Sequence, residues 1–485
     1  MRKTRILIFC LVAGLILHGA AVWAQRTTPM EPTEESLSCN ECHAEQTTAI
    51  YQEWGKSKHH RANVGCYECH RAEEGDPDAF DHMGSLISII VSPKDCARCH
   101  AKEVEEFDES HHAKAGLILG SLDNFLADVV EGDKNFYGGS ALTVSGCKQC
   151  HGGVVKVNED GSLEPTGWPN TGMGRLNPDG SIGACTACHQ RHAFSAEQAR
   201  RPENCGKCHL GPDHPQKEIY EESKHGIAYR AHEDELNLGS SKWVLGEDYT
   251  AAPTCATCHM SALRASNGEL VPVTHDVGLR ISWNNRPPMS IRPEVSDAKL
   301  GLDKMAQVDW KTRRKNMIQV CTVCHTSTYV DNFYEQYDGV IELYNSKFAE
   351  PALGMMKTLY SYGLITDTKF DEQVEWTWWE IWHHEGRVAR HGASMMAPDY
   401  THWHGLYEVA KHFYTKLIPE LREIAEKHHH SEDAQKAEGA AKLSGALEEM
   451  LARPEHSWYT GEISLEEAEA RRKAQAEFKA RYGQE

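Results

Sequence analysis

Sixteen of the 17 cysteines lie in eight copies of one motif, in which two cysteines are separated by two residues and followed directly by a histidine. Two thiols at this spacing can add to the two vinyl groups of one haem, and the adjacent histidine then ligates the iron. The sequence therefore predicts eight covalently attached c-type haems with eight proximal histidines. In chain order, motifs 1 to 8 are Cys39-Cys42-His43, Cys66-Cys69-His70, Cys96-Cys99-His100, Cys147-Cys150-His151, Cys185-Cys188-His189, Cys205-Cys208-His209, Cys255-Cys258-His259 and Cys321-Cys324-His325.

Zinc or disulfides would use these cysteines in another way. A zinc site of this type pairs two CxxC units around one ion and gives no role to a histidine after each unit. A disulfide framework is typical of short secreted chains, whereas this chain has 485 residues. The histidine after every CxxC unit and the length of the chain therefore exclude a zinc site and a disulfide framework.

A second repeat indicates where the opposite axial ligands come from. An aromatic residue, two residues, serine, one residue and histidine recur three times, ending at His59, His112 and His225. On a short helix this spacing lets the ring cover one haem while the histidine reaches an iron. The predicted distal ligands are these three together with His192, His232, His275 and His404, chosen from a wider pool that includes His82 and His391. Their pairing with haems stays open.

Ligand number decides what each haem can do. An iron with two histidines carries electrons but has no position for a substrate, so catalysis requires at least one open iron. The triplet His428 to His430 lies in a polar helical stretch and is interpreted as a solvated face.

The charge balance limits the partners. Lys and Arg number 51 against 71 Asp and Glu, which gives a net charge of −20. Nucleic acid is excluded as a partner because no basic block could hold its phosphates. An acidic surface suits a redox partner with a basic face, such as a small cytochrome c.

The first 24 residues look like an export signal. Arg2, Lys3 and Arg5 precede an apolar run, and Val22 to Ala24 offer small residues at the cleavage site. We expect cleavage and export to the periplasm or an equivalent compartment, an uncleaved membrane anchor being the alternative. Because no later apolar run is long enough to span a bilayer, we expect no transmembrane anchor in the mature protein.

The distribution of cysteines, helix breakers and helical spacing along the chain predicts the elements that position the motifs. We predict a mainly α fold in which short helices and loops wrap eight c-type haems over residues 25–330, followed by a helical domain over 331–485. In the second part, helical spacing covers 331–359, 371–391, 402–430, 432–453 and 464–483, with breaks near Pro351, Gly363, Pro398 and Pro454. This part either packs between subunits or forms a solvated tail.

Five segments between and after the motifs resemble the octahaem hydroxylamine oxidoreductase family. They are PNTGMGRLNPDG at 169–180, CTACHQRH at 185–192, GPDHP at 211–215, WNNRPP at 283–288 and MMAPDYTHWHG at 395–405. The resemblance covers nearly the whole chain after residue 24. It implies a homotrimer in which the haem of Cys147, Cys150 and His151 has no distal protein ligand and binds substrate, while seven haems have two histidines.

The resemblance also implies catalytic side chains. An Asp-His pair, placed here at Asp213 and His214, would take protons from the substrate. In the oxidising branch of the family a tyrosine of a neighbouring subunit is bonded to the catalytic haem, and Tyr400 is the first candidate. Tyr407 and Tyr414 follow at seven-residue steps, so on one helix all three would share a face.

These expectations define the predicted function. The chain would oxidise hydroxylamine to nitric oxide or nitrite, or hydrazine to dinitrogen, at the fourth haem. One alternative is a reductase of nitrite or hydroxylamine without the tyrosine cross-link. The other is a cytochrome that only transfers electrons.

Overall fold

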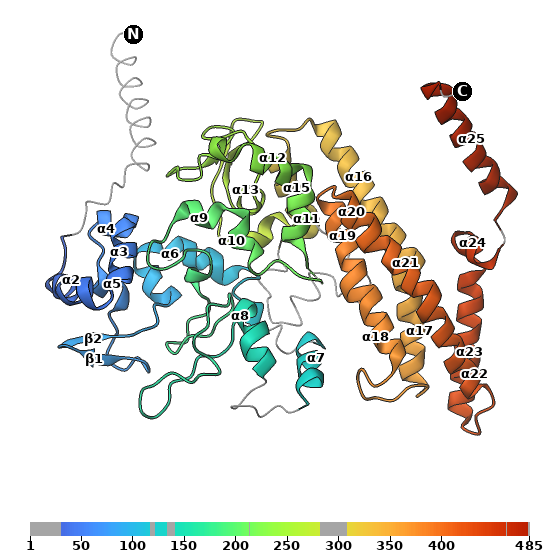
Figure 1. Ribbon diagram of the computed structural model, residues 1–485, viewed down its shortest axis with the longest axis horizontal. Coiled ribbons are helices and arrows are strands. Elements are labelled where there is room, and N and C mark those ends of the chain that lie inside the picture. The colour runs from blue at the N-terminus through green and yellow to red at the C-terminus, as the bar shows by residue number, and fades with distance from the viewer. Residues whose placement is uncertain are drawn as a thin grey trace, which may run out of the picture.

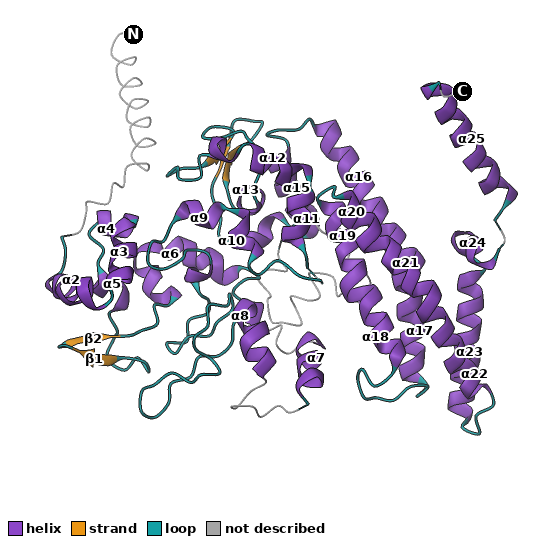
Figure 2. Ribbon diagram, viewed as in Figure 1, coloured by secondary structure: helices purple, strands orange, loops and turns teal. Residues whose placement is uncertain are grey.

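The structure is a computed structural model that describes residues 31–116, 122–132, 141–212, 214–281, 308–461 and 463–483. The predicted export signal, Asp213 and the 283–288 segment lie outside these ranges. Helices dominate the described chain, as Figure 2 shows, which confirms the mainly α prediction.

The first half consists of short helices joined by long loops (Figure 1). The elements up to motif 4 are α2 (Glu34–Gln46), α3 (Thr48–Lys56), α4 (Lys58–Arg61), α5 (Cys66–His70), α6 (Pro93–Glu109), α7 (Leu122–Glu131), η4 (Thr143–Cys147) and α8 (Lys148–His151). From motif 5 to motif 7 they are η5 (Cys185–Ala187), α9 (Ala196–Arg200), α10 (Pro202–Gly206), α11 (Gln216–Glu222), α12 (Lys224–Ala231), η6 (Glu233–Leu236), α13 (Cys255–His259) and η7 (Val277–Arg280).

Strands are few and short. The hairpin of β1 (Phe80–His82) and β2 (Ser85–Ile87) is antiparallel, with Phe80 opposite Ile87. The second sheet pairs β3 (Val244–Leu245) in parallel with β4 (Ala262–Arg264), which is antiparallel to β5 (Leu270–Val271).

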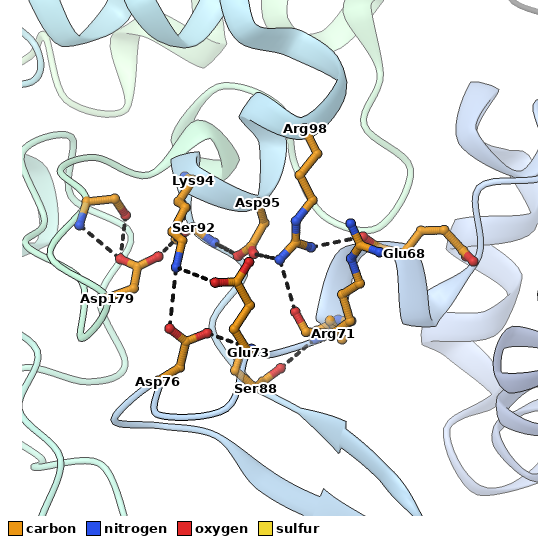
Figure 3. Close-up of polar contacts among 12 residues, drawn as sticks. Glu68, Arg71, Glu73, Asp76, Ser88, Ser92, Lys94, Asp95, Arg98 and Asp179 are labelled. Carbon is orange, nitrogen blue, oxygen red and sulfur yellow. Dashed lines mark hydrogen bonds and ion pairs between the residues drawn. The ribbon is translucent and has the colours of Figure 1, made fainter.

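A polar network fixes the helix that carries motif 3 (Figure 3). The Ser92 hydroxyl accepts from Lys94 N at the start of α6 and donates to Asp179 at 2.6 Å, which ties the helix to the 169–180 segment. Lys94 Nζ lies 3.4 Å from Asp76 in the loop before β1, and Arg98 pairs with Asp95 at 2.9 Å. Serine before proline is a strong helix start, because the hydroxyl satisfies a free amide and proline needs no partner there.

Helices fill the second half, several of them joined end to end by π-turns, and most of them pack side by side (Figure 1). They are α15 (Trp310–Cys321), α16 (Ser327–Tyr344), η9 (Asn345–Ala349), α17 (Glu350–Ser361), α18 (Gln373–Trp379), η10 (Glu380–Glu385), α19 (Gly386–Ser394), α20 (Pro398–Thr401), η11 (His402–Tyr407), α21 (Glu408–His412), η12 (Phe413–Leu417), α22 (Ile418–His429), α23 (Ala434–Leu451), η13 (Pro454–His456), α24 (Ser457–Thr460) and α25 (Leu465–Tyr482). Their core contains fully buried Leu359, Leu417, Leu421 and Leu443. The boundary predicted at residue 330 falls inside α16.

One predicted break is wrong. The helix runs through Pro351, because this proline stands in the first turn of α17 directly after the π-turn η9, where its missing N–H costs little. The break at Gly363 is confirmed by its left-handed backbone, φ +62°. Pro398 and Pro454 each begin a new helix, as proline at a first helical position should.

The last helix differs from the others. No residue of α25 is buried, and it projects from the bundle (Figure 1). None of the helices over the described ranges is long and apolar enough to cross a membrane.

Candidate haem sites and catalytic centre

Each motif presents its two thiols and histidine over one local turn. Motif 7 is one short helix, α13, whose start is fixed by Thr254 accepting from Thr257 N at 3.3 Å. Cysteines three residues apart on a helix lie on the same face. None of the 16 motif cysteines, all within the described ranges, forms a disulfide, and Cys42, Cys99 and Cys324 are exposed. The disulfide alternative is therefore not seen, and the pairs fit thioether attachment of a haem.

Six motif histidines face a second histidine across a narrow gap. Two metal–imidazole bonds of about 2 Å place the ring centroids of trans ligands about 6 Å apart. The observed centroid separations are 6.1 Å for His43 and His82, 6.1 Å for His100 and His59, 6.5 Å for His70 and His192, 6.5 Å for His189 and His275, 6.2 Å for His209 and His112, and 6.1 Å for His325 and His225.

The pairing does not follow the order of the chain. His59 comes shortly after motif 1 but faces His100 of motif 3, and His192 comes just after motif 5 but faces His70 of motif 2. Five of the seven predicted distal histidines are brought to a motif histidine in this way. His82, from the wider pool, is the sixth.

Two predicted distal ligands lie elsewhere. His232 is half exposed and pairs with Glu235 at 2.9 Å. His404 is also exposed and lies 3.3 Å from Asp399. The structure places neither beside a motif histidine, because both stand at helix positions that face solvent.

The repeat that selected three distal histidines is a structural unit. Its serine N–H donates to the carbonyl of the aromatic residue at 2.9 Å in the first two copies and 3.0 Å in the third, with Ser57, Ser110 and Ser223 almost fully buried. The serine is extended and ends one helix, so the aromatic residue and the histidine do not share a helix as predicted. In the first and third copies its hydroxyl then caps the next helix.

Burial favours the neutral form of several paired imidazoles. It lowers the pKa of His112 to about 3 and that of His189 to about 4, and it lowers the pKa of His59 and His225. The neutral ring is the form that ligates a metal. His70 is also oriented from behind, because its Nδ1 lies 2.9 Å from the Ser88 carbonyl.

Backbone contacts clamp the end of motif 4. Met173 N donates to the Cys150 carbonyl at 2.9 Å, and Gly174 N donates to the His151 carbonyl at 3.0 Å. A Cβ on Gly172 would lie 2.2 Å from Gly152 N, and Gly152 itself has φ +87°. The glycines of the 169–180 segment therefore let one backbone touch another just beyond His151.

His214 lies between motifs 4 and 6. Its ring is 6.4 Å from that of His209 and nearly perpendicular to it. A hydrogen bond with the Cys208 thiol, followed by the charge of His214, lowers the pKa of Cys150. His391 of α19 is 2% exposed, and burial, followed by repulsion from Arg387 and Arg390 and then from His214, lowers its pKa. His391 belongs to the wider pool of candidate ligands, and its place shortly before the 395–405 segment is the sequence signal that could have singled it out.

The three candidate tyrosines do not share a face. Tyr400 is half-buried in α20, Tyr407 is 48% exposed, and Tyr414 is 4% exposed with its hydroxyl 2.7 Å from His456. The prediction of a common face fails because the π-turns η11 and η12 each shift the helical phase between them. Burial, followed by Glu222 and Glu218 of α11, raises the pKa of Tyr400.

Three family models match parts of the chain. Residues 179–372 match the multihaem cytochrome family described as "seven times multi-haem cytochrome CxxCH". Residues 133–210 match cytochrome c7 and related cytochromes c, and residues 1–92 match the N-terminal region of the NapC/NirT cytochrome c family.

Relatives support a narrower assignment. A probable nitrite reductase-hydroxylamine oxidoreductase fusion protein of Kuenenia stuttgartiensis is 25% identical in an alignment of 336 positions that covers 62% of this chain and 35% of the relative. The chain thus spans about a third of that protein. A solved hypothetical multihaem protein is 29% identical with TM-score 0.67, covering 82% of this chain and 98% of the other. The reducing HAO-like protein complex of the same Kuenenia shares the fold, at 19% identity, TM-score 0.53 and coverage of 87% and 90%.

The chain is a multihaem cytochrome c that is similar to hydroxylamine oxidoreductase-like proteins. The cytochrome carries covalently bound c-type haems.

The glycine clamp of the cytochrome gives a testable prediction. Gly172→Ala should destabilise the protein by about 1–3 kcal/mol, because the methyl group would force two packed backbones apart. Gly146→Ala is the matched control, since a Cβ there meets nothing within 4 Å. Thermal unfolding of both purified variants measures the difference. Equal unfolding temperatures would contradict the clamp.

Proposed function

We propose that this cytochrome oxidises hydroxylamine or hydrazine at the haem held by Cys147, Cys150 and His151. The observation that supports this most is the position of His214 near Cys150, with His391 buried close by. A substrate that loses electrons must also lose protons, and imidazoles are suited to accept them at neutral pH.

The bound haem would supply an iron that accepts electrons from a nitrogen substrate. The protein's part is to hold this site apart from bulk water and to move protons. His214, with Asp213 before it in the chain, is proposed as the proton acceptor. The clamp of 172–174 on Cys150 and His151 would keep the fourth haem in one orientation.

The remaining motifs would carry electrons. We assign His82, His59, His192, His275, His112 and His225 as distal ligands of haems 1, 3, 2, 5, 6 and 8, because their rings stand at the separation of trans imidazoles. His259 of motif 7 is proposed as the proximal ligand of a seventh such haem. The total of eight haems follows from the motif count.

The proposed setting is an exported homotrimer. An acidic chain with net charge −20 would dock a basic electron acceptor such as a small cytochrome c, through contacts weakened by salt. Cys42, Cys99 and Cys324 are exposed, so the haems that they would hold are proposed to lie nearest the surface. These haems are the proposed points of electron exit.

A second candidate is reduction of nitrite or hydroxylamine on the same scaffold. The half-buried setting of Tyr400 favours it, because this tyrosine lies near the carboxylates of α11 in its own subunit. A phenol held there is less available to a neighbouring subunit. Without a tyrosine cross-link, the haems would pass electrons to the substrate and reduce it.

Mass spectrometry of denatured, untreated protein tests the direction. If a tyrosine joins neighbouring subunits to haem, we expect a covalent trimer that separates into haem-bearing monomers in a Tyr400→Phe variant. Tyr407→Phe is the control and should leave the trimer intact. A monomer carrying eight haems in the unaltered protein would overturn the oxidative proposal and support the reductive one. Low-spin signals from every haem would overturn both.

A further inference from the structure

Three metal-ligating side chains of the C-terminal helices, none of them part of a CxxCH motif, lie close together. Glu380 and Glu385 come from η10 and His412 ends α21. One ligand atom from each lies within 4.8 Å of the others. His412 Nδ1 makes a short contact with Glu385 Oε1 and lies 3.8 Å from Glu380 Oε2.

The π-turn explains how the two carboxylates converge. In a π-turn the backbone hydrogen bond joins residues i and i+5, so side chains five residues apart lie on the same side of the turn. Glu380 and Glu385 have this spacing within η10. In an α-helix only residues three or four apart are neighbours, and these carboxylates would diverge.

Of the three side chains, only Glu385 has a buried polar atom without a hydrogen-bond partner. Its side chain is 12% exposed, and its buried Oε2 has no hydrogen-bond partner. Burial, followed by repulsion from Glu380 and Glu408, raises its pKa to about 8. A buried oxygen without a partner is costly unless something else binds there.

We propose that Glu380, Glu385 and His412 bind one divalent metal ion, with zinc as the ion that the donor set fits best. One imidazole and two carboxylates leave a fourth tetrahedral position for water. A metal ion binds the neutral imidazole and the ionised carboxylates, so binding would release any proton that these three side chains hold. The site would fasten α18–α19 to α21–α22 in the bundle.

Two lysines also face this metal cluster. Lys416 Nζ lies 3.2 Å from Glu380 Oε2, and Lys411 pairs with Glu408 at 2.9 Å. A metal ion would take the place of Lys416 beside Glu380. Removing the Lys416 charge should therefore strengthen metal binding.

The test uses the full haem-loaded protein, stripped with a chelator and titrated with zinc against a competing fluorescent chelator. We expect one tight zinc per subunit and more than ~10-fold weaker binding in Glu385→Gln and His412→Gln, since loss of even an outer-shell partner costs that much. Lys416→Met should bind more tightly than the unaltered protein. Lys442→Met, which removes a lysine paired with Glu438 on α23, should not.

Controls separate this site from other zinc ligands and from misfolding. His429→Gln removes part of the exposed triplet and should keep the tight site. Circular dichroism of the metal-free variants should match the unaltered protein, and zinc should raise the unfolding temperature only where the cluster is intact. Equal zinc affinity in Glu385→Gln and the unaltered protein would overturn the site. Binding of Mn²⁺ or Ca²⁺ but not zinc would overturn the assignment of the ion.

Discussion

A His214→Gln variant is expected to lose at least ~10²-fold in kcat for hydroxylamine oxidation, the lower range for removal of a general acid or base. Glutamine is close in size and polar but cannot take up a proton. Because His214 lies beside motifs 4 and 6 and is not a motif histidine, haem content should stay unchanged. The measurement is kcat for hydroxylamine oxidation with an artificial electron acceptor, taken at a series of pH values for the variant and the unaltered protein.

The pH profile distinguishes proton transfer from a packing role. If His214 accepts the proton, the limb of kcat/KM that reports its titration should vanish in the variant. His232→Gln is the matched control, because this half-exposed histidine pairs only with a surface carboxylate in the described structure. A His214→Gln variant with a lowered rate but an unchanged pH profile would contradict the proposed role.

A His225→Ala variant is expected to convert one haem per subunit from low spin to high spin. The His225 ring faces His325 at 6.1 Å, so its removal would leave that iron with one protein ligand. Burial lowers the pKa of His225, and alanine leaves a cavity of ring size in its place. Electron paramagnetic resonance of the oxidised protein measures the spin change.

Added imidazole makes this prediction specific. It should enter the cavity and restore the low-spin signal that the variant has lost, over and above any binding at the open fourth haem, which the variant and the unaltered protein share. His404→Ala is the control, because His404 is exposed beside Asp399 and away from any motif histidine. An unchanged spin state in His225→Ala would exclude it as a ligand.

The chemistry of the motifs was readable from the sequence, because covalent attachment depends only on local spacing. The aromatic-serine-histidine repeat likewise selected His59, His112 and His225, all of which face a motif histidine. Which motif each would face could not be predicted, since the partner comes from a distant part of the chain. His82 had no such repeat to mark it.

Predictions about the helical half failed where the helices depart from α geometry. Pro351 is compatible with a continuing helix only because η9 precedes α17, and Tyr400 and Tyr414 lost their common face through η11 and η12. The energy difference between an α-turn and a π-turn is set by tertiary packing. A pattern with a fixed period of 3.6 residues carries no signal for it.

The crossed histidine pairs have a consequence for how the protein matures. If the chain is exported from its N-terminus, the His59–His100 pair could form once the first three motifs have emerged, whereas His70 would have to wait for His192. Until then a newly attached haem would lack its second histidine, and other imidazoles of the chain could take that place. Wrong ligands would form first and exchange later, so assembly of this cytochrome is a problem of ligand sorting as much as of haem attachment.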